Sequence, residues 1–225
     1  MKNKNVLVIA AHADDETLGC GGTIQKFKKL GHNVYVMVFT DGVSSRKKKL
    51  SKKINDRSKQ LKKVSKLLNF KIFKQYNLPD NELDKISNLE LVKKIEAAII
   101  KISPEIILTH SSKDLNIDHQ KISNATITAC RPLPKSKIKQ LLFFEIPSSS
   151  EWNFNSNVIN FNPNKFYDIS GFIEKKLEAI KIYKSEIRQY PHPRSLEGIK
   201  TLSKFRGQCV GVNYAEAFEV GYIKD

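Results

Sequence analysis

At Val6–Glu16 the chain reads VLVIAAHADDE, an unbroken apolar run that passes directly into a charged cluster. The apolar part predicts a strand buried on both faces, which we assign to residues 5–11. In open α/β sheets, ligands bind outside the carboxyl ends of the strands. So dense a set of charges costs folding free energy unless a cation or a substrate compensates it, so this stretch predicts a functional site. Its four metal-competent side chains are His12, Asp14, Asp15 and Glu16.

The rest of the chain alternates strand-like and helix-like segments. Further strands are predicted at 33–39, 70–73, 105–110 and 141–144, and helices at 17–30, 53–68, 88–102, 119–129, 169–189 and 196–206. Residues 76–80 and 153–168 are predicted as loops, the second with an edge strand, and 214–220 as a final strand or packed extension. This alternation predicts an α/β fold: one Rossmann-like domain over residues 1–225, with a mostly parallel sheet of order 3-2-1-4-5 and helices on both faces.

The first predicted helix contains Gly19-Cys20-Gly21-Gly22, which superficially resembles a dinucleotide-binding turn. Its G-x-G-G spacing differs from G-x-G-x-x-G, and acidic residues occupy the place of a pyrophosphate. We therefore expect the glycines to allow close packing of the helix against a strand. The same helix is expected to expose Gln25. Its core-facing side is expected to consist of Leu18, Ile24, Phe27 and Leu30.

Cysteine usage and hydropathy bound the cellular setting. Cys20, Cys130 and Cys209 lie far apart and form no disulfide or metal framework, which indicates a reducing compartment. The N-terminal apolar run is too short for a signal peptide, and no segment reaches the about eighteen apolar residues of a membrane span. We therefore expect a cytoplasmic protein without a transmembrane segment, and a homo-oligomer is compatible with the sequence.

The net charge of +16 has two interpretations. Lysines are spread along the chain, with local runs at residues 46–53 and 135–139, and no aromatic residues are interleaved with these runs. A stacking groove for nucleic acid is therefore not indicated, and no nucleic-acid partner is expected. The charge is either a solvated surface or a means of attracting an anionic substrate such as a phosphate.

A metal site follows from the placement of three side chains. His12 and Asp15 are three residues apart at a strand end, so a turn can direct both at one ion. His119 is the best third ligand, because the first and fourth strands are neighbours in the expected sheet order. A catalytic zinc commonly takes three His and carboxylate ligands and leaves one position for water, whose pKa it lowers. Asp14 is then the general base toward that water. Zn²⁺ is the expected metal, with Fe²⁺ or Co²⁺ as alternatives for the same ligands.

The segment at 11–16, combined with Asp118-His119 after the fourth strand, resembles the LmbE/PIG-L family of zinc-dependent de-N-acetylases. The similarity extends to family segments at 40–42, 114–119, 131–132, 191–195, 206–207 and 214–218. The resemblance implies a hydrolase that removes an N-acetyl group from an amino sugar, a small molecule that is free, phosphorylated, nucleotide-linked or lipid-linked. It also implies that His12, Asp15 and His119 bind zinc and that Asp14 is the base.

One departure from the family bears on the mechanism. Many relatives have His where this chain has Asn116, and that His, oriented by the Asp at the position of Asp118, stabilises the oxyanion or protonates the leaving amine. Asn can donate a hydrogen bond but cannot deliver a proton at neutral pH. We therefore expect Asp14 to carry the proton in both directions and Asn116 to be an oxyanion donor, with His110 or His192 as an alternative acid. Asp118 is also expected to cap the helix that begins at residue 119.

Three further residues are candidates for substrate binding. Arg57 is either a solvent-exposed helix charge or, by the resemblance, an arginine that contacts substrate. His192 and Arg194 lie in a proline-braced loop, which is either a rigid turn between helices or a wall of the substrate pocket, where Arg194 meets a phosphate or carboxylate. We expect the C-terminal part, from about residue 145 to 225, to complete this pocket. The alternative function is a Rossmann-like nucleotide- or cofactor-binding protein without hydrolase activity.

Overall fold

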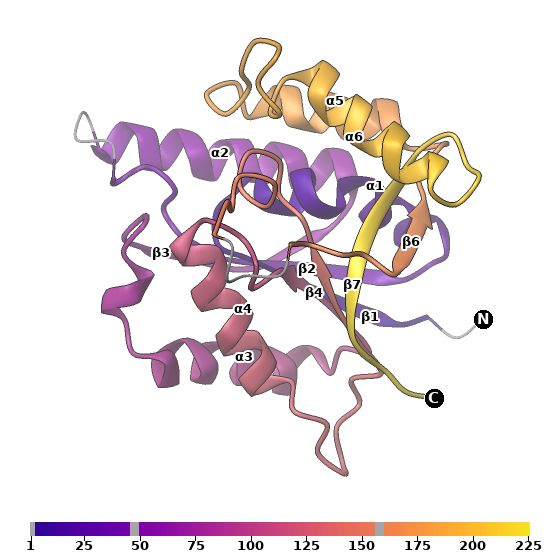
Figure 1. Cartoon of the computed structure of the whole chain (residues 1–225). Helices are drawn as coiled ribbons and strands as arrows, with labels where there is room; N and C mark the ends of the chain where they lie inside the picture. Colours follow the sequence, from indigo (N-terminus) through magenta and orange to yellow (C-terminus); the bar gives the residue numbers. More distant parts are fainter. Residues whose placement is uncertain (1–2, 46–49, 156–159) are drawn as a thin grey trace.

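The centre of the molecule is one sheet of seven strands in the order β3-β2-β1-β4-β5-β7-β6 (Figure 1). The computed structural model describes residues 3–45, 50–155 and 160–225, so Arg46–Lys49 of the first basic run lies outside the described residues. The strands are β1 (Asn5–Ala10), β2 (Asn33–Thr40), β3 (Lys71–Leu78), β4 (Ile106–His110), β5 (Gln140–Phe144), β6 (Lys165–Asp168) and β7 (Ala215–Ile223).

Helices cover both faces of this sheet (Figure 1). One face carries α1 (Asp15–Lys29), α2 (Leu50–Leu68), α5 (Ile173–Ile182) and α6 (Leu196–Gln208). The other carries α3 (Asn88–Ile102) and α4 (Ile117–Ala129), with the short 3₁₀ helix η1 (Leu83–Lys85) before them. None of the helices in the described part of the chain combines the length and the apolar character needed to span a bilayer.

Strand β1 lies inside the sheet, paired in parallel with β2 on one side and β4 on the other. Val6, Val8 and Ala10 pack into the core under α1 and α2, whereas Leu7 and Ile9 pack into the core under α3 and α4. None of the five side chains is accessible to solvent. The prediction that the apolar run is buried on both faces is therefore confirmed.

The expected order is confirmed for the five parallel strands, and the sheet then continues beyond it. β7 pairs antiparallel with β5, and β6 pairs antiparallel with the outer side of β7. The predicted final strand at 214–220 and the predicted edge strand within 153–168 are thus β7 and β6. The C-terminal segment therefore adds two strands to the sheet that the order 3-2-1-4-5 did not include.

Several predicted boundaries and exposures differ from the structure. β3 runs to Leu78, through part of the loop predicted at 76–80, because it pairs with β2 as far as Thr40. α5 ends at Ile182 rather than continuing to residue 189. On α1, Leu30 is 47% exposed rather than buried, and the buried Gln25 donates a hydrogen bond to the carbonyl oxygen of Leu68 rather than facing solvent.

The glycines of α1 pack against core side chains, as predicted. A Cβ on Gly19 would overlap the ring of Phe144, and one on Gly22 would lie 2.8 Å from the side chain of Ile169. α1 is also kinked at Cys20 (φ −148°, ψ 23°), which frees backbone N–H groups in the middle of the helix. Glu216 of β7 accepts hydrogen bonds from two of them, the N–H groups of Gly22 (2.9 Å) and of the next residue (2.6 Å).

We expect Gly19→Ala to lower the free energy of unfolding by about 1–2 kcal/mol, because overlap with the Phe144 ring outweighs the gain in helix propensity. Gly171→Ala is the matched control, since a Cβ there meets no atom within 4 Å, and it should change stability by less than about 0.5 kcal/mol. Urea denaturation of both variants measures the difference. Equal stability of the two variants would contradict close packing at Gly19.

Candidate metal centre

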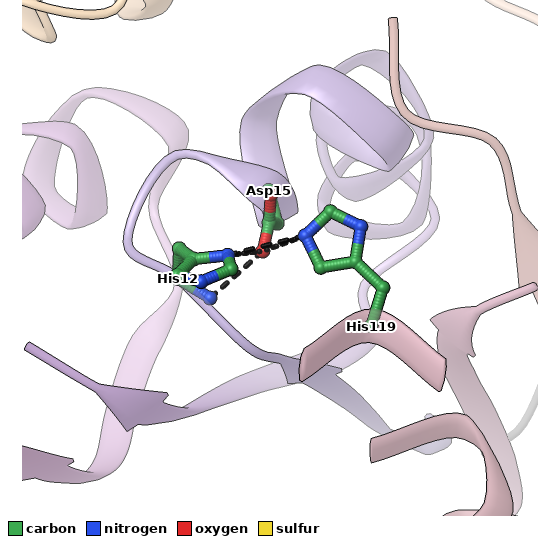
Figure 2. A group of neighbouring side chains, drawn as sticks. All are labelled: His12, Asp15 and His119. Carbon is green, nitrogen blue, oxygen red and sulfur yellow. Dashed lines mark hydrogen bonds and ion pairs between the residues drawn. The ribbon is translucent and has the colours of Figure 1, made fainter. Parts of the chain in front are cut away.

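The three predicted ligands meet at the carboxyl ends of β1 and β4 (Figure 2). His12 comes from the turn between β1 and α1, Asp15 is the first residue of α1, and His119 lies in the first turn of α4. The Nδ1 atom of His12 lies 3.2 Å from Asp15 Oδ2 and 3.1 Å from His119 Nε2. Asp15 Oδ2 and His119 Nε2 are 3.4 Å apart. Three potential ligand atoms thus form a compact triangle.

The residues of this triangle fit a zinc-type ion. Ligand atoms at about 2.0–2.1 Å from a tetrahedral zinc lie about 3.3 Å from one another, which matches the three separations. Asp15 and His119 are buried, and the side chain of His12 is 12% exposed, so the triangle is reached from the side of His12. The second carboxylate oxygen of Asp15, Oδ1, is buried without a hydrogen-bond partner among the described residues. A cation there would compensate this carboxylate.

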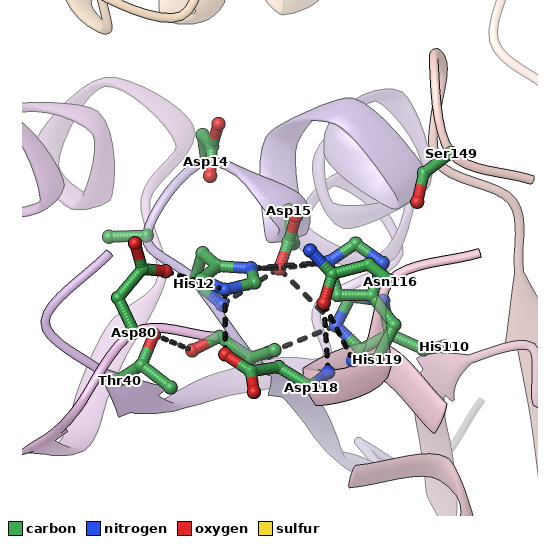
Figure 3. Close-up of polar contacts among 12 residues, drawn as sticks. His12, Asp14, Asp15, Thr40, Asp80, His110, Asn116, Asp118, His119 and Ser149 are labelled. Carbon is green, nitrogen blue, oxygen red and sulfur yellow. Dashed lines mark hydrogen bonds and ion pairs between the residues drawn. The ribbon is translucent and has the colours of Figure 1, made fainter. Parts of the chain in front are cut away.

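Carboxylates orient both imidazole rings, and Figure 3 shows the two that face His12. The Nε2 atom of His12 lies 3.1 Å from Asp118 Oδ2 and 3.1 Å from Asp80 Oδ1. The Nδ1 atom of His119 lies 3.1 Å from Asp114 Oδ1, at ion-pair distance though outside hydrogen-bond geometry. In each ring the proton is therefore drawn to the nitrogen that faces the carboxylate, and the lone pair of the other nitrogen points into the triangle.

The electrostatics of the triangle favour positive charge at its centre. Burial alone would lower the pKa of His119, but the carboxylates of Asp114 and Asp15 raise it to about 9. Burial likewise opposes the charged form of His12, and Asp15 and Asp118 still raise its pKa well above the ordinary value. The pKa of Asp15, which burial would raise, is held well below its usual range by the neighbouring histidines. A divalent cation would supply this positive charge in place of protons.

Two residues of the centre were not predicted to have a role. Asp80 follows β3 and Asp114 follows β4, so both lie at the carboxyl ends of parallel strands, as His12 does. That position is the signal that could have identified them. Ser149 and Ser150 donate hydrogen bonds to Asp114 from the loop after β5, and nothing in their sequence pattern indicates this.

Asp118 is not the cap of α4, and this prediction is wrong. Asn116 is the N-cap residue: its Oδ1 accepts hydrogen bonds from the backbone N–H groups of Asp118 (2.8 Å) and His119 (3.4 Å). The carboxylate of Asp118 instead accepts the backbone N–H groups of Asn81 (2.7 Å) and Leu83 (3.0 Å), which leaves its Oδ2 beside His12. Because the amide oxygen of Asn116 belongs to the helix, only its Nδ2 remains for a role toward substrate.

Asp14 stands beside the triangle rather than in it, in an unusual backbone conformation (Figure 3). Its φ of 147° is one that L residues rarely adopt and costs about 1–3 kcal/mol. Its N–H donates to Glu16 Oε2 (3.0 Å), and the other oxygen of Glu16 accepts the hydroxyl of the buried Tyr183 (2.8 Å). Burial raises the pKa of the Asp14 carboxyl to about 6, although nearby arginines lower it.

Two arginines flank the Asp14 carboxylate. Arg194 Nη1 lies 3.4 Å and Arg57 Nη1 3.8 Å from Asp14 Oδ2. Arg57 is 3% exposed, donates to the carbonyl oxygen of Ala13 (2.9 Å) and forms an ion pair with Glu186. The interpretation of Arg57 as a solvent-exposed helix charge is therefore wrong. Glu186 lies in a segment predicted as helix, and no sequence signal indicated it.

The two histidines considered as acids lie in different surroundings. His110 is fully buried and stacked on His119, and burial lowers its pKa to about 4. Its Nε2 accepts the backbone N–H of Ala11 (2.9 Å), so at neutral pH it is an uncharged packing residue. His192 is partly exposed, accepts the N–H of Arg194 at Nδ1 (3.0 Å) and contacts the ring of Trp152.

Fold and site together define an α/β protein with a candidate mononuclear metal centre at the carboxyl edge of its sheet. Residues 7–130 match the model of the GlcNAc-PI de-N-acetylase (PIG-L) family. This match covers more than half of the chain, and the protein belongs to this family.

Named relatives agree with this assignment. The chain is 29% identical over 191 residues to the uncharacterized deacetylase YaiS of Escherichia coli, covering 82% of this chain and 92% of that protein. It is 27% identical over 230 residues to the diacetylchitobiose deacetylase of Thermococcus kodakarensis, covering 95% and 81%. The structure of N,N'-diacetylchitobiose deacetylase from Pyrococcus horikoshii has the same fold, with a TM-score of 0.78, 24% identity and coverage of 96% and 83%.

The alternative of a nucleotide-binding protein without hydrolase activity is not supported. These two curated relatives are deacetylases, and Gly19 and Gly22 pack against the core rather than opening toward a ligand. The glycine-rich stretch therefore has a structural explanation.

We expect His12→Ala and His119→Ala to abolish stoichiometric zinc binding, because each removes one corner of the triangle. His192→Ala is the matched control, since His192 lies near the site without belonging to the triangle. Zinc binding is measured as the metal content of the purified proteins and as the rise in melting temperature when zinc is added to metal-free protein. Retention of one zinc in either triangle variant, or its loss in His192→Ala, would contradict the site.

Proposed function

We propose that this protein is a zinc-dependent deacetylase that hydrolyses the acetamide of an N-acetylated amino sugar. The observation that carries the proposal is the triangle of His12, Asp15 and His119 with the carboxylate of Asp14 beside it but outside it. This separation leaves Asp14 available for proton transfer. Membership of the PIG-L family and the relatives' activity on diacetylchitobiose support the substrate class.

In this proposal the ligand residues and Asp14 divide the work. A bound divalent cation would polarise the acetamide carbonyl and lower the pKa of a water molecule beside it. Asp14 takes a proton from the water molecule as the water oxygen adds to the carbonyl carbon of the acetamide. Asp14 then returns the proton to the nitrogen as the C–N bond breaks, which gives acetate and a free amine. A pKa near 6 suits a group that must both accept and release a proton near neutral pH.

The flanking arginines have a positioning role toward Asp14 and a binding role toward substrate. Arg57 is anchored by Ala13 and Glu186, so it holds its place when the site is empty. Arg194 donates from its Nε to the carbonyl oxygen of Pro147 (3.1 Å) and from its Nη1 to Asp14 Oδ2 (3.4 Å), and its side chain is 19% exposed. We assign Arg194 and His192 to the wall of the substrate pocket. Both residues come from the C-terminal part of the chain, which supports the proposal that about residues 145–225 complete that pocket within a single domain.

Asn116 remains the proposed oxyanion donor, but only through its side-chain nitrogen Nδ2. Its Nδ2 donates weakly to Asn81 Oδ1 (3.2 Å), and because an amide nitrogen carries two N–H groups, the second can donate to a developing oxyanion while Oδ1 caps α4. Asp118 acts through His12, whose ring it orients, rather than through Asn116. Zinc is the proposed metal, and Fe²⁺ or Co²⁺ fit the same ligands.

We expect zinc-loaded protein to release acetate from at least one member of a panel of N-acetylglucosamine glycosides, sugar phosphates and nucleotide sugars. Asp14→Asn should lower kcat by at least about 100-fold, because amide cannot accept the proton, while zinc content is unchanged. Acetate release measures kcat, and metal analysis measures the zinc content. Full activity of Asp14→Asn, or no acetate from any substrate with zinc bound, would contradict the proposal.

Asn116→Ser separates the two roles of Asn116. Serine keeps an N-cap acceptor, so the free energy of unfolding should change by less than about 0.5 kcal/mol, but it removes the amide donor. We expect a lower kcat with an unchanged melting temperature. Asn116→Ala is the comparison, because it loses the cap as well and should unfold about 1 kcal/mol more easily. If Asn116→Ser turns over substrate as fast as the native protein, Asn116 acts only as the N-cap of α4 and is not an oxyanion donor.

A further inference from the structure

A groove runs along the surface between α2 and the C-terminal end of α5, starting at Arg57. Its inner hollow, of about 250 Å³, is lined among others by Lys53, Arg57 and Lys184. Its outer hollow, of about 450 Å³, is lined by further lysines of α2 and α5. The two hollows share lining residues, among them Asp56 and Lys184, so they form one continuous groove, which we call the α2–α5 groove. Figure 1 shows the two helices side by side.

The groove collects positive charge from two distant parts of the chain. Lys53, Lys59 and Lys63 come from α2, and Lys181 and Lys184 from the end of α5 and the residues after it. Asp56 is the one acidic residue among the described lining residues of both hollows. None of the five lysines takes part in an ion pair within the described residues. Like charges around one hollow repel one another, and a bound anion would relieve that repulsion.

The inner end of the groove is walled by Arg57, whose other side faces the proposed catalytic centre. Arg57 lines the inner hollow, and its Nη1 lies 3.8 Å from Asp14 Oδ2. If the acetamide of a substrate lies beside Asp14, a substituent on the anomeric carbon has to pass only Arg57 to reach the groove. The lysines that line the hollow between Arg131 and Lys137, next to α3 and α4, have no such connection.

We propose that the α2–α5 groove binds a phosphate or diphosphate group carried by the substrate at the anomeric carbon, next to the carbon that bears the acetamide. This rests on the proposed function and names its substrate class: a phosphorylated or diphosphate-linked N-acetylated amino sugar. Lysine recognises phosphate as a point charge, whereas a planar carboxylate is better matched by the fork of arginine. The one arginine lining the groove, Arg57, already uses its fork on Ala13 and Glu186. Phosphate is therefore favoured over carboxylate.

The test compares substrates that share one acetamide and differ in charge. The neutral substrate is methyl N-acetylglucosaminide, the monoester is N-acetylglucosamine 1-phosphate, and the diphosphate is uridine diphosphate N-acetylglucosamine. We expect a lower KM for at least one of the charged substrates, and this KM should rise with salt. The ratio of the KM values of the two charged substrates shows whether the groove prefers a free sugar phosphate or a diphosphate-linked sugar. Equal KM values for neutral and charged substrates would overturn the proposal.

Variants locate the effect. Lys181→Gln with Lys184→Gln should raise the KM of the preferred charged substrate about five- to tenfold and leave kcat and the neutral substrate unchanged. Lys135→Gln with Lys137→Gln removes the same charge from the other face of the sheet and is the matched control. Equal effects of the two pairs would mean that net charge acts at long range, and the groove would not be the binding site.

Binding in the absence of turnover separates this proposal from the proposed function. Calorimetry needs no catalysis. It is carried out with N-acetylglucosamine 1-phosphate and with uridine diphosphate N-acetylglucosamine, on zinc-loaded Asp14→Asn with and without the groove substitutions. Binding that depends on Lys181 and Lys184, without acetate release by the native protein, would uphold the groove and reject the deacetylase. Acetate release that does not depend on a phosphate group in the substrate would uphold the deacetylase and reject the groove as a phosphate site.

Discussion

A single carboxylate oxygen, Oδ2 of Asp15, holds the site together. It accepts the backbone N–H of His12 (2.7 Å) and lies 3.2–3.4 Å from ring nitrogens of His12, His110 and His119. These histidines come from the end of β1, the end of β4 and the start of α4. A buried carboxylate is costly unless opposite charge compensates it, so the neighbouring strands and helix must keep the rings of His12 and His119, whose pKa values are raised, in place. The parallel pairing of β1 with β4 is thus what makes the centre geometrically feasible.

A second constraint connects the C-terminal third of the chain to the same turn. Tyr183 and Glu186, which follow α5, contact Glu16 and Arg57, which in turn hold the backbone of Asp14 and the carbonyl of Ala13. The strained φ of Asp14 persists because these buried contacts over-determine it. Chemistry proposed for the N-terminal motif therefore depends on residues that lie far away in sequence.

How far the sequence predicts this structure differs from one residue to the next. The burial of β1, the parallel core of the sheet and the meeting of His12, Asp15 and His119 follow from apolar periodicity and from the geometry of strand ends. The cap of α4 was misassigned, because Asn116 and Asp118 are both good cap residues and only the fold decides between them. Arg57 and Gln25 have the pattern of surface residues, and they are buried by partners, Glu186 and Leu68, that local periodicity cannot identify.

β7, which is formed by residues close to the end of the described chain, lies between β5 and β6 rather than at the rim of the sheet. During synthesis the five parallel strands leave the ribosome first, and until β7 arrives the backbone groups of β5 form an open edge. An unpaired edge of this kind can pair with another chain. Glu216, on the same strand, also caps the second half of α1. Folding of the first helix is therefore completed by a residue 194 positions further along the chain than Gly22, and until that residue has been made the unfinished chain has a period in which chaperone protection is of most use.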